Sequence, residues 1–422
     1  KKIVIMKKNI YIYVVAFVGV LLANSAVGYA QSSTKTLQQC IDEALENSFS
    51  MKSGRKTVDR ASALEKTSFN IGMTNVSLSQ DPSSGGSPDN GIAVTQDFDF
   101  PTVYTSRRKA LKAETALERS NLAMTQNELI RTVTTSYYEL LFEQQRIAVL
   151  KDQNKIYSEF VYLAKTKFEL GESSRLELMN AERLYEENQL ELQKAKRSYE
   201  NVQLALQKWM NSDEFVTPFE VELPTLELNH PLSDFNPIET PFGQVFEAKR
   251  VIGQRNLALT KQGYIPTFSV TLKSQMLIKG FNPYDIQRDR FTEGNFMGFQ
   301  VGVNVPLFFR EQRFKTKAAK IDFQLAKLKQ DEALLYLKND YKSYENEYYK
   351  AKNSLDYFTN KGRTMASEMI RISKLMYEKG EISYIEYIQN LNTSVDISLK
   401  HLSAINDYNQ TIIMLNYLHG KN

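Results

Sequence analysis

Two short segments, one before the middle of the chain and one near its end, constrain the fold more than any other feature. Residues 171–179 read GESSRLELM, and residues 380–388 read GEISYIEYI. The two glycines are 209 residues apart (380 − 171 = 209), about half of the 422-residue chain. Each segment separates two long helix-forming stretches. The pattern predicts an internal duplication in which each half holds a helical hairpin that turns at the glycine.

The stretches that flank these segments predict helices of unusual length. From residue 102 to residue 170 the sequence contains neither proline nor glycine. A helix of roughly 70 residues is about 100 Å long, and this length favours coiled-coil packing over a globular helix. We expect long helices at 102–170, 174–210, 310–379 and 382–418.

Four further segments alternate between apolar and polar residues, as strands do. The expected strands are 75–80, 91–100, 267–277 and 297–306. An apolar face opposite a polar one is common in soluble sandwiches. Here the sequence offers no core for the apolar faces, and most of these strands have roughly the 9 to 11 residues that cross a bilayer. Backbone groups in lipid must be paired, so four strands alone cannot span it, whereas three copies of the chain would supply twelve.

The fold class that follows is a mixed α/β membrane channel. We expect a trimeric 12-stranded β-barrel, with four strands per chain, continued by a long α-helical coiled-coil barrel. Residues 31–211 form the first repeat and 242–422 the second, each read as helix, two strands, very long helix, turn and long helix. Residues 212–241 hold five of the eleven prolines and are expected to be an irregular equatorial segment.

The first 30 residues predict a signal peptide. Lys7 and Lys8 precede the apolar run 10–27, and small residues at Gly28 and Ala30 fit cleavage before Gln31. An N-terminal membrane anchor is the alternative, because the apolar run is long. No later stretch approaches 18 apolar residues, so we expect no transmembrane helix in the mature chain.

Composition and motifs argue against several other classes of protein. A net charge of +4 with 24% charged residues shows neither a nucleic-acid patch nor an acidic tail. The single cysteine, Cys40, excludes an intrachain disulfide framework. The three histidines, His230, His401 and His419, lie far apart in sequence, so no metal site and no cofactor are expected. There is no GxSxG, P-loop or HExxH motif, which argues against an enzyme.

The sequence resembles the TolC family, the outer-membrane channels of tripartite efflux pumps and type I secretion systems. The resemblance covers residues 31–422. It rests on TLQQCIDEALENS from Thr36, on the two glycine segments, and on the strand-to-helix passages QDFDFPTVYTSRRKA from Gln96 and VNVPLFFREQRFKTKA from Val303. The passage from Gln96 is most similar to the heavy-metal, CzcC-like branch.

The resemblance implies a homotrimer in the outer membrane of a Gram-negative bacterium, with a periplasmic helical tunnel closed at its far end. It also implies a periplasmic adaptor protein and an inner-membrane transporter, most readily of the RND type, as partners. The channel would be a passive duct in contact with outer-membrane lipid. A duct for polypeptide secretion is the nearest alternative. A structural coiled-coil surface protein would explain the helices but not the strands.

The resemblance also suggests residues for the aperture. Glu177 and Glu386 stand six positions after the glycines, where family members often carry aspartate, and three copies of Glu386 would form an anionic ring. The alternative is that both are solvated carboxylates in the first turn of a helix. Tyr377 matches a tyrosine that in the family helps to latch the closed end. The alternative is that Tyr377 is an aromatic residue packed between the helices of the coiled coil. Two positions depart from the family, with Ile382 in place of the latch arginine and Gln389 in place of a second aspartate.

The remaining candidates lie in the turns themselves. Gly171 and Gly380 are expected to provide the backbone conformation of the turns, because the position after a helix C-terminus commonly needs φ > 0. The polar residues beside them are expected to dock the adaptor, or simply to be solvated: Glu172, Ser174, Glu381 and Ser383.

Overall fold

The computed structural model describes residues 32–82, 88–228, 230–276 and 296–420. The expected signal peptide at 1–30 lies outside these residues. The chain divides into two compact units. Unit 1 combines Lys1–Ser48, Thr132–Leu226 and Ala351–Gln410, and unit 2 combines Phe49–Arg131, Glu227–Lys350 and Thr411–Asn422. Each unit therefore draws on both halves of the sequence.

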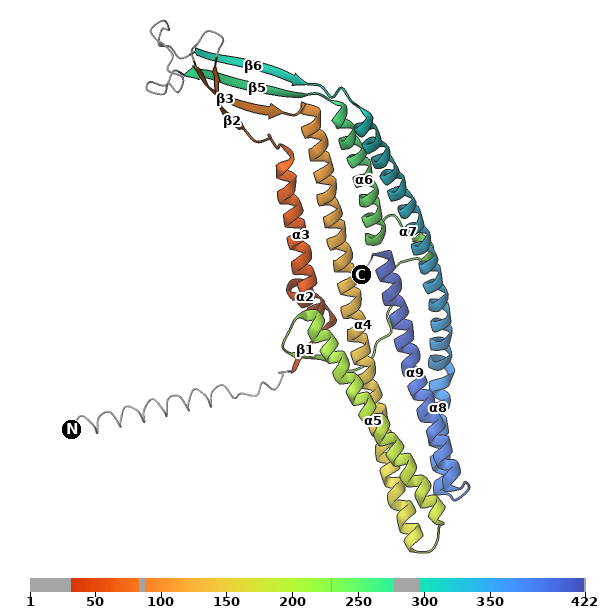
Figure 1. Ribbon diagram of the computed structural model, residues 1–422. Coiled ribbons are helices and arrows are strands. Elements are labelled where there is room, and N and C mark those ends of the chain that lie inside the picture. The colour runs from red at the N-terminus through yellow and green to blue at the C-terminus, as the bar shows by residue number, and fades with distance from the viewer. Residues whose placement is uncertain (1–31, 83–87, 229, 277–295, 421–422) are drawn as a thin grey trace, which may run out of the picture. The chain divides into compact units, whose positions relative to one another are not determined.

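Unit 2 contains a four-stranded antiparallel sheet in the order β2-β3-β5-β6 (Figure 1). Its strands are β2 (Asn75–Pro82), β3 (Pro88–Phe98), β5 (Thr267–Met276) and β6 (Phe296–Asn304). The inner pair, β3 and β5, joins strands from the two halves of the chain.

The register of the sheet gathers the apolar residues of all four strands on one face. Val94 pairs with Leu272, and Leu272 pairs with Phe299. One position along, Thr95 pairs with Thr271 and Thr271 with Gln300, which places polar residues on the opposite face. The Thr95 and Thr271 hydroxyls are 3.0 Å apart, within hydrogen-bonding distance. One face is therefore apolar and the other polar, as the alternation predicts.

Four helices that lie in unit 2 wholly or in part lead into and out of this sheet. α3 (Phe49–Glu65) precedes β2, and α6 (Pro241–Lys261) precedes β5. α4 (Pro101–Glu169) begins three residues after β3, with a proline in its first turn, where the missing N–H carries no penalty. α7 (Arg310–Tyr357) follows β6. The N-terminus of α6 is capped by the Thr240 hydroxyl, which accepts from the Gly243 N–H at 3.0 Å.

Unit 1 contains a second, small sheet. β1 (Ser32–Lys35) pairs in parallel with β4 (Phe215–Pro218), which lies inside the segment 212–241 that the sequence analysis reads as irregular. The buried Tyr137 hydroxyl donates to the Lys35 carbonyl at 2.9 Å and accepts from the Phe219 N–H at 3.3 Å. Thus α4 holds both strands in place through one side chain.

Two expected helices are divided in the structure. The stretch before β2 forms α2 (Leu37–Asn47) and α3, separated at Ser48. The stretch 310–379 forms α7 and α8 (Arg363–Glu378), with a π-helical segment at Phe358–Gly362 between them. A Cβ on Gly362 would lie 2.9 Å from the Phe358 ring, so this glycine permits the close packing. The prediction of one uninterrupted helix overlooks Gly362.

Two more long helices complete the chain: α5 (Arg175–Met210), which belongs to unit 1, and α9 (Tyr384–His419), whose last residues from Thr411 onward are assigned to unit 2. Among the described residues, no helix has an apolar stretch long enough to cross a membrane.

Candidate functional site

The hairpin between α4 and α5 turns at Gly171, as the sequence predicts. Gly171 has φ = 76°, which an L-residue rarely adopts. The Gly171 N–H donates to the Phe168 carbonyl (3.0 Å) and the Glu172 N–H donates to the Lys167 carbonyl (2.8 Å). This pair of bonds is the Schellman arrangement that satisfies the last carbonyls of a helix. A Cβ at Gly171 would meet open space, so φ alone requires glycine.

The hairpin between α8 and α9 repeats this geometry. Gly380 has φ = 75°, and its N–H donates to the Tyr377 carbonyl at 3.0 Å. The Glu381 N–H donates to the Met376 carbonyl at 2.9 Å. The matching Gly-Glu pairs therefore encode the same helix end twice. Glu172 and Glu381 take part through their backbone, and both are exposed.

The two matching serines begin the next helices. The Ser174 hydroxyl accepts from the Glu177 N–H at 3.3 Å, and the Ser383 hydroxyl accepts from the Glu386 N–H, also at 3.3 Å. Both serines are thus N-caps. In the second hairpin the Glu386 carboxylate also accepts from the Ser383 N–H at 2.7 Å, which completes a capping box.

The capping box sets the charge state of Glu386. The hydrogen bond from the Ser383 backbone, then that from its side chain, holds the pKa of Glu386 below its usual value. The side chain is nonetheless exposed to solvent, as is Gln389 one turn further along α9. Glu177 occupies the same position in the first turn of α5 and is partly buried. A single chain does not bring Glu177 and Glu386 together, since they belong to different hairpins.

Tyr377 belongs to an aromatic cluster at the α8–α9 hairpin. Its ring stacks on Tyr387 at a centroid distance of 5.1 Å and meets Tyr384 edge-on at 5.5 Å. Phe160, from α4, lies 3.8 Å from the Tyr384 ring. Burial raises the pKa of Tyr384, whose hydroxyl has no hydrogen-bond partner among the described residues.

The cluster is part of a small core that joins the two hairpins within unit 1. Phe160, Ala164, Ala181, Ile388 and Leu391 are its buried members, from α4, α5 and α9. Nearby, the Tyr157 hydroxyl donates to the side-chain oxygen of Asn392, which links α4 to α9 by a polar contact. The Gln153 amide donates to the same hydroxyl at 2.7 Å. The hairpins are therefore packed together near their ends. Ile382 is partly buried.

Three members of the cluster around Tyr377 were not predicted from the sequence: Tyr384 and Tyr387, which contact Tyr377, and Phe160, which contacts Tyr384. The spacing of Tyr384 and Tyr387, three residues apart on one helix, places them on one face and was an available signal. The contact with Phe160 joins residues more than 220 positions apart (384 − 160 = 224), and no local pattern reveals it.

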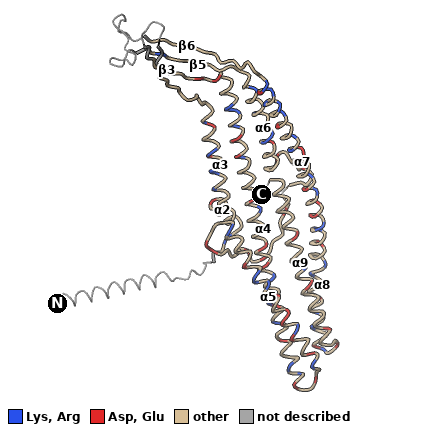
Figure 2. Tube along the Cα trace, viewed as in Figure 1, with Lys and Arg blue, Asp and Glu red and all other residues tan. Residues whose placement is uncertain are grey.

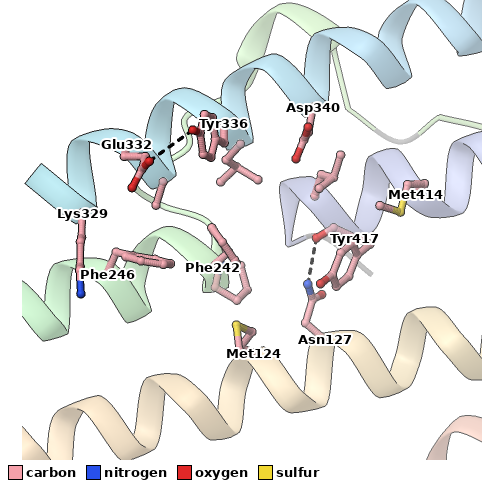
Figure 3. Close-up of a pocket in the computed structure, with 14 residues that line it drawn as sticks. Met124, Asn127, Phe242, Phe246, Lys329, Glu332, Tyr336, Asp340, Met414 and Tyr417 are labelled. Carbon is pink, nitrogen blue, oxygen red and sulfur yellow. Dashed lines mark hydrogen bonds between the residues drawn. The ribbon is translucent and has the colours of Figure 1, made fainter.

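A second candidate site is a cavity of about 460 Å³ in unit 2, where the start of α6 lies near the end of α9 (Figure 3). Its aromatic and thioether walls come from Phe242, Phe246, Tyr336, Tyr417, Met124 and Met414. The Tyr336 hydroxyl donates to Glu332 at 3.3 Å, and the Asn127 amide donates to the Tyr417 carbonyl at 2.9 Å. These contacts pair no nucleophile with a base. Among the described residues, no cluster of three or more His, Cys, Asp or Glu side chains could hold a metal ion.

Part of the chain matches one protein family, and most of the chain shares its fold with solved structures. Residues 40–212 match the family described as Outer membrane efflux protein. No curated protein sequence matches the chain. Among solved structures, CusC is similar over 92% of this chain and 92% of its own, with a TM-score of 0.73 and 15% identity.

Two further structures share the fold. The outer membrane protein VceC of Vibrio cholerae matches over 91% of this chain and 96% of its own, with a TM-score of 0.73 and 12% identity. The outer membrane channel MtrE of Neisseria gonorrhoeae, solved in its open state, matches over 91% and 88%, with a TM-score of 0.73 and 16% identity. At these identities the likeness is one of fold, and it does not distinguish the CzcC-like branch from others.

Proposed function

We propose that the chain belongs to the outer membrane efflux protein family and forms the exit duct of a tripartite efflux pump. Two findings support this proposal: residues 40–212 match that family, and the fold is that of solved outer membrane channels. In this role it conducts substrates passively from an inner-membrane transporter to the cell exterior. The channel is not an enzyme, so the energy for export comes from the transporter.

The observation that carries the proposal is the exposed apolar face of the sheet. Leu78 on β2 is 82% exposed, and Phe299 on β6 is 78% exposed. These two strands are also the edges of the sheet, each paired on one side only within the described residues. An apolar face with open edges would aggregate in water. A closed barrel in lipid places the apolar face against the hydrocarbon and pairs the backbone groups of both edge strands.

Closure requires further copies of the chain. With β6 of one copy beside β2 of the next, three copies of four strands supply twelve, an even number as in other outer-membrane barrels. The polar face, with Thr95, Thr271 and Lys273, would then line the lumen. The long helices α4 and α7 continue from β3 and β6 into the periplasm.

The hairpins are the proposed place of gating and docking. Three copies of Glu386 would surround a narrow aperture and favour cations, with Glu177, Tyr377 and Gln389 as the other gate residues. The tight turns are proposed to dock a periplasmic adaptor through exposed positions: Gly171, Glu172, Ser174, Gly380, Glu381 and Ser383. The adaptor would connect the duct to an inner-membrane transporter, of the RND type in our proposal.

Cross-linking between strands tests the closure directly. In a Cys40→Ser background, Ser77→Cys on β2 would be combined in turn with Gly298→Cys, Gln300→Cys and Gly302→Cys on β6. Within one chain these positions lie at opposite edges of the sheet, too far apart for a disulfide. Oxidation should therefore yield covalent dimers and trimers for at least one pair, which identifies the register. A protein that stays monomeric and water-soluble for all three pairs would exclude the duct.

A further inference from the structure

The first turns of α7 present a face of basic residues. Arg310, Arg313, Lys317 and Lys320 are all exposed, and their spacing of three, four and three places them within about a quarter turn of the helix. We call these four residues the basic face. Figure 2 shows Lys and Arg residues gathered on this part of α7, beside the end of β6.

The basic face has no ion-pair partner among the described residues. Lys315 is paired with Glu311 at 2.6 Å, but both project from a different side of the helix. Within the described parts of the chain, no carboxylate lies within ion-pair distance of the basic face. The N-terminus of a helix also carries a partial positive charge, which disfavours cations in its first turn. Arg310 and Arg313 are therefore placed where an external anion would stabilise them.

The basic face continues directly from the exposed apolar row of β6. Val301, Val303 and Val305 are each at least half exposed, and Leu307 (76%) and Phe308 (92%) carry this row to the start of α7. An apolar row, then an aromatic residue, then cations is the order expected where a chain leaves the hydrocarbon for the head-group layer.

Apolar side chains also lie among the cations. Phe314 (57% exposed) lies beside Arg310 and Lys317, and Ile321 (45% exposed) lies beside Lys317, along one edge of the basic face. A helical face that mixes basic and large apolar side chains is typical of helices at a membrane surface. If this face contacted only water, exposing the Phe314 ring would be unfavourable, whereas contact with lipid would bury it.

The first repeat has a similar arrangement where α4 begins after β3. Arg108, Lys109 and Lys112 are exposed there. Arg108 precedes Lys317 by 209 residues (317 − 108 = 209), the same offset that relates the two hairpin glycines. Cations thus follow the strands at both places where the chain passes from strand to long helix.

We propose that the basic face of α7 binds the phosphate head groups of anionic phospholipids at the inner boundary of the membrane. The lipid is favoured over an acidic protein because the face is continuous with the apolar row that we assign to the bilayer. Binding would fix the depth of the barrel in the membrane and anchor the helix that follows it. The inference rests on the proposed outer-membrane duct.

Lipid retention by the intact assembly tests this inference. Wild-type protein would be reconstituted into nanodiscs of phosphatidylcholine with phosphatidylglycerol, and native mass spectrometry would count the lipids that stay bound. The informative variants are Lys317→Gln and the combination of Arg313→Gln, Lys317→Gln and Lys320→Gln. Lys315→Gln is the matched control, because it removes the same charge two residues away on another side of the helix. Conductance of every variant in planar bilayers tests the duct separately.

The wild type should retain phosphatidylglycerol in preference to phosphatidylcholine. Each cation near an anionic surface should account for about a fivefold preference, so Lys317→Gln should lower it about fivefold and the triple variant much further. Lys315→Gln should retain the wild-type preference. Higher salt should weaken it.

Three results would overturn the inference while the duct stands. The first is a conducting wild type without preference for the anionic lipid. The second is an equal loss with Lys315→Gln and Lys317→Gln. The third is displacement of the lipid by inorganic phosphate but not by chloride at the same ionic strength, which would indicate a site for free phosphate. A protein that neither inserts nor conducts would instead contradict the proposed function.

Discussion

The Glu386 carboxylate accepts a 2.7 Å hydrogen bond from the Ser383 N–H, while the Ser383 hydroxyl accepts from the Glu386 N–H at 3.3 Å. This reciprocal contact gives Glu386 a structural task in each chain, in addition to the charge that it would contribute to an aperture. The two tasks can be separated by experiment.

Neutralising Glu386 should reduce cation preference. Glu386→Gln removes the charge of the proposed ring while its side chain can still accept from Ser383, so the hairpin should stay folded. The reversal potential in planar bilayers under a salt gradient measures the preference. The exposed Glu381, which our account places outside the aperture, provides the control Glu381→Gln. Unchanged selectivity of Glu386→Gln would remove Glu386 from the aperture.

The charge of Glu386 should also persist to low pH. Its pKa lies below the usual 4.5 because the folded hairpin donates hydrogen bonds to the charged form. The resulting stabilisation is present above the pKa of the unfolded chain and is lost as pH falls through the lower pKa of the folded hairpin. Cation preference should therefore survive down to pH values below 4.5. Loss at a higher pH would show that repulsion among three close carboxylates outweighs the capping bonds.

Substitution of the hairpin glycines should destabilise the protein through backbone conformation alone. Gly171→Ala and Gly380→Ala each place an L-residue at positive φ, which costs about 1–2 kcal/mol. Gly72→Ala is the control, because its Cβ would also meet open space and its φ is not positive. Thermal unfolding in detergent should show lower midpoints for the first two variants only. Equal midpoints for all three would contradict the conformational argument.

The Tyr384 hydroxyl should be dispensable for stability. It is buried without a hydrogen-bond partner among the described residues, so Tyr384→Phe should be neutral or stabilising by about 1 kcal/mol. Tyr157→Phe is the contrasting variant, since it removes a hydroxyl that contacts Asn392 and Gln153 and should cost about 1 kcal/mol. Marked destabilisation by Tyr384→Phe would mean that a neighbouring chain supplies a partner to this hydroxyl.

Cys40 should react slowly with thiol reagents in the folded protein. It has no exposed surface, and burial raises the pKa of its thiol to about 12, so almost no thiolate exists at neutral pH. Because it is the only cysteine, its labelling by a maleimide reports directly on opening of unit 1. Labelling should become fast only in denaturant. Rapid labelling at pH 7 of the native protein would contradict the packing around α2.

The long helices and the amphipathic strands could be predicted from the sequence, and the structure confirms both for the single chain. Long helices need only a run without breakers, and amphipathic strands reveal themselves by alternation. The hairpin turns could be predicted equally well, because Gly171 and Ser174 act on backbone groups within a few residues of themselves.

What the sequence could not reveal depends on contacts between distant residues. The pairing of β1 with β4 joins Ser32 to Phe215, and its strands of four residues are too short to show alternation. Phe160 and Tyr384 meet only because the two hairpins pack together. The break at Ser48 likewise has no glycine or proline to mark it. The aperture roles of Glu177, Glu386, Tyr377 and Gln389 remain predictions, because they concern the meeting of three chains.

Conductance of the purified protein in planar lipid bilayers tests the central claim most directly. The account predicts that a detergent-resistant trimer inserts and forms a stable, cation-preferring pore whose closed state depends on the hairpins. A water-soluble monomer that adds no conductance to the bilayer would contradict it.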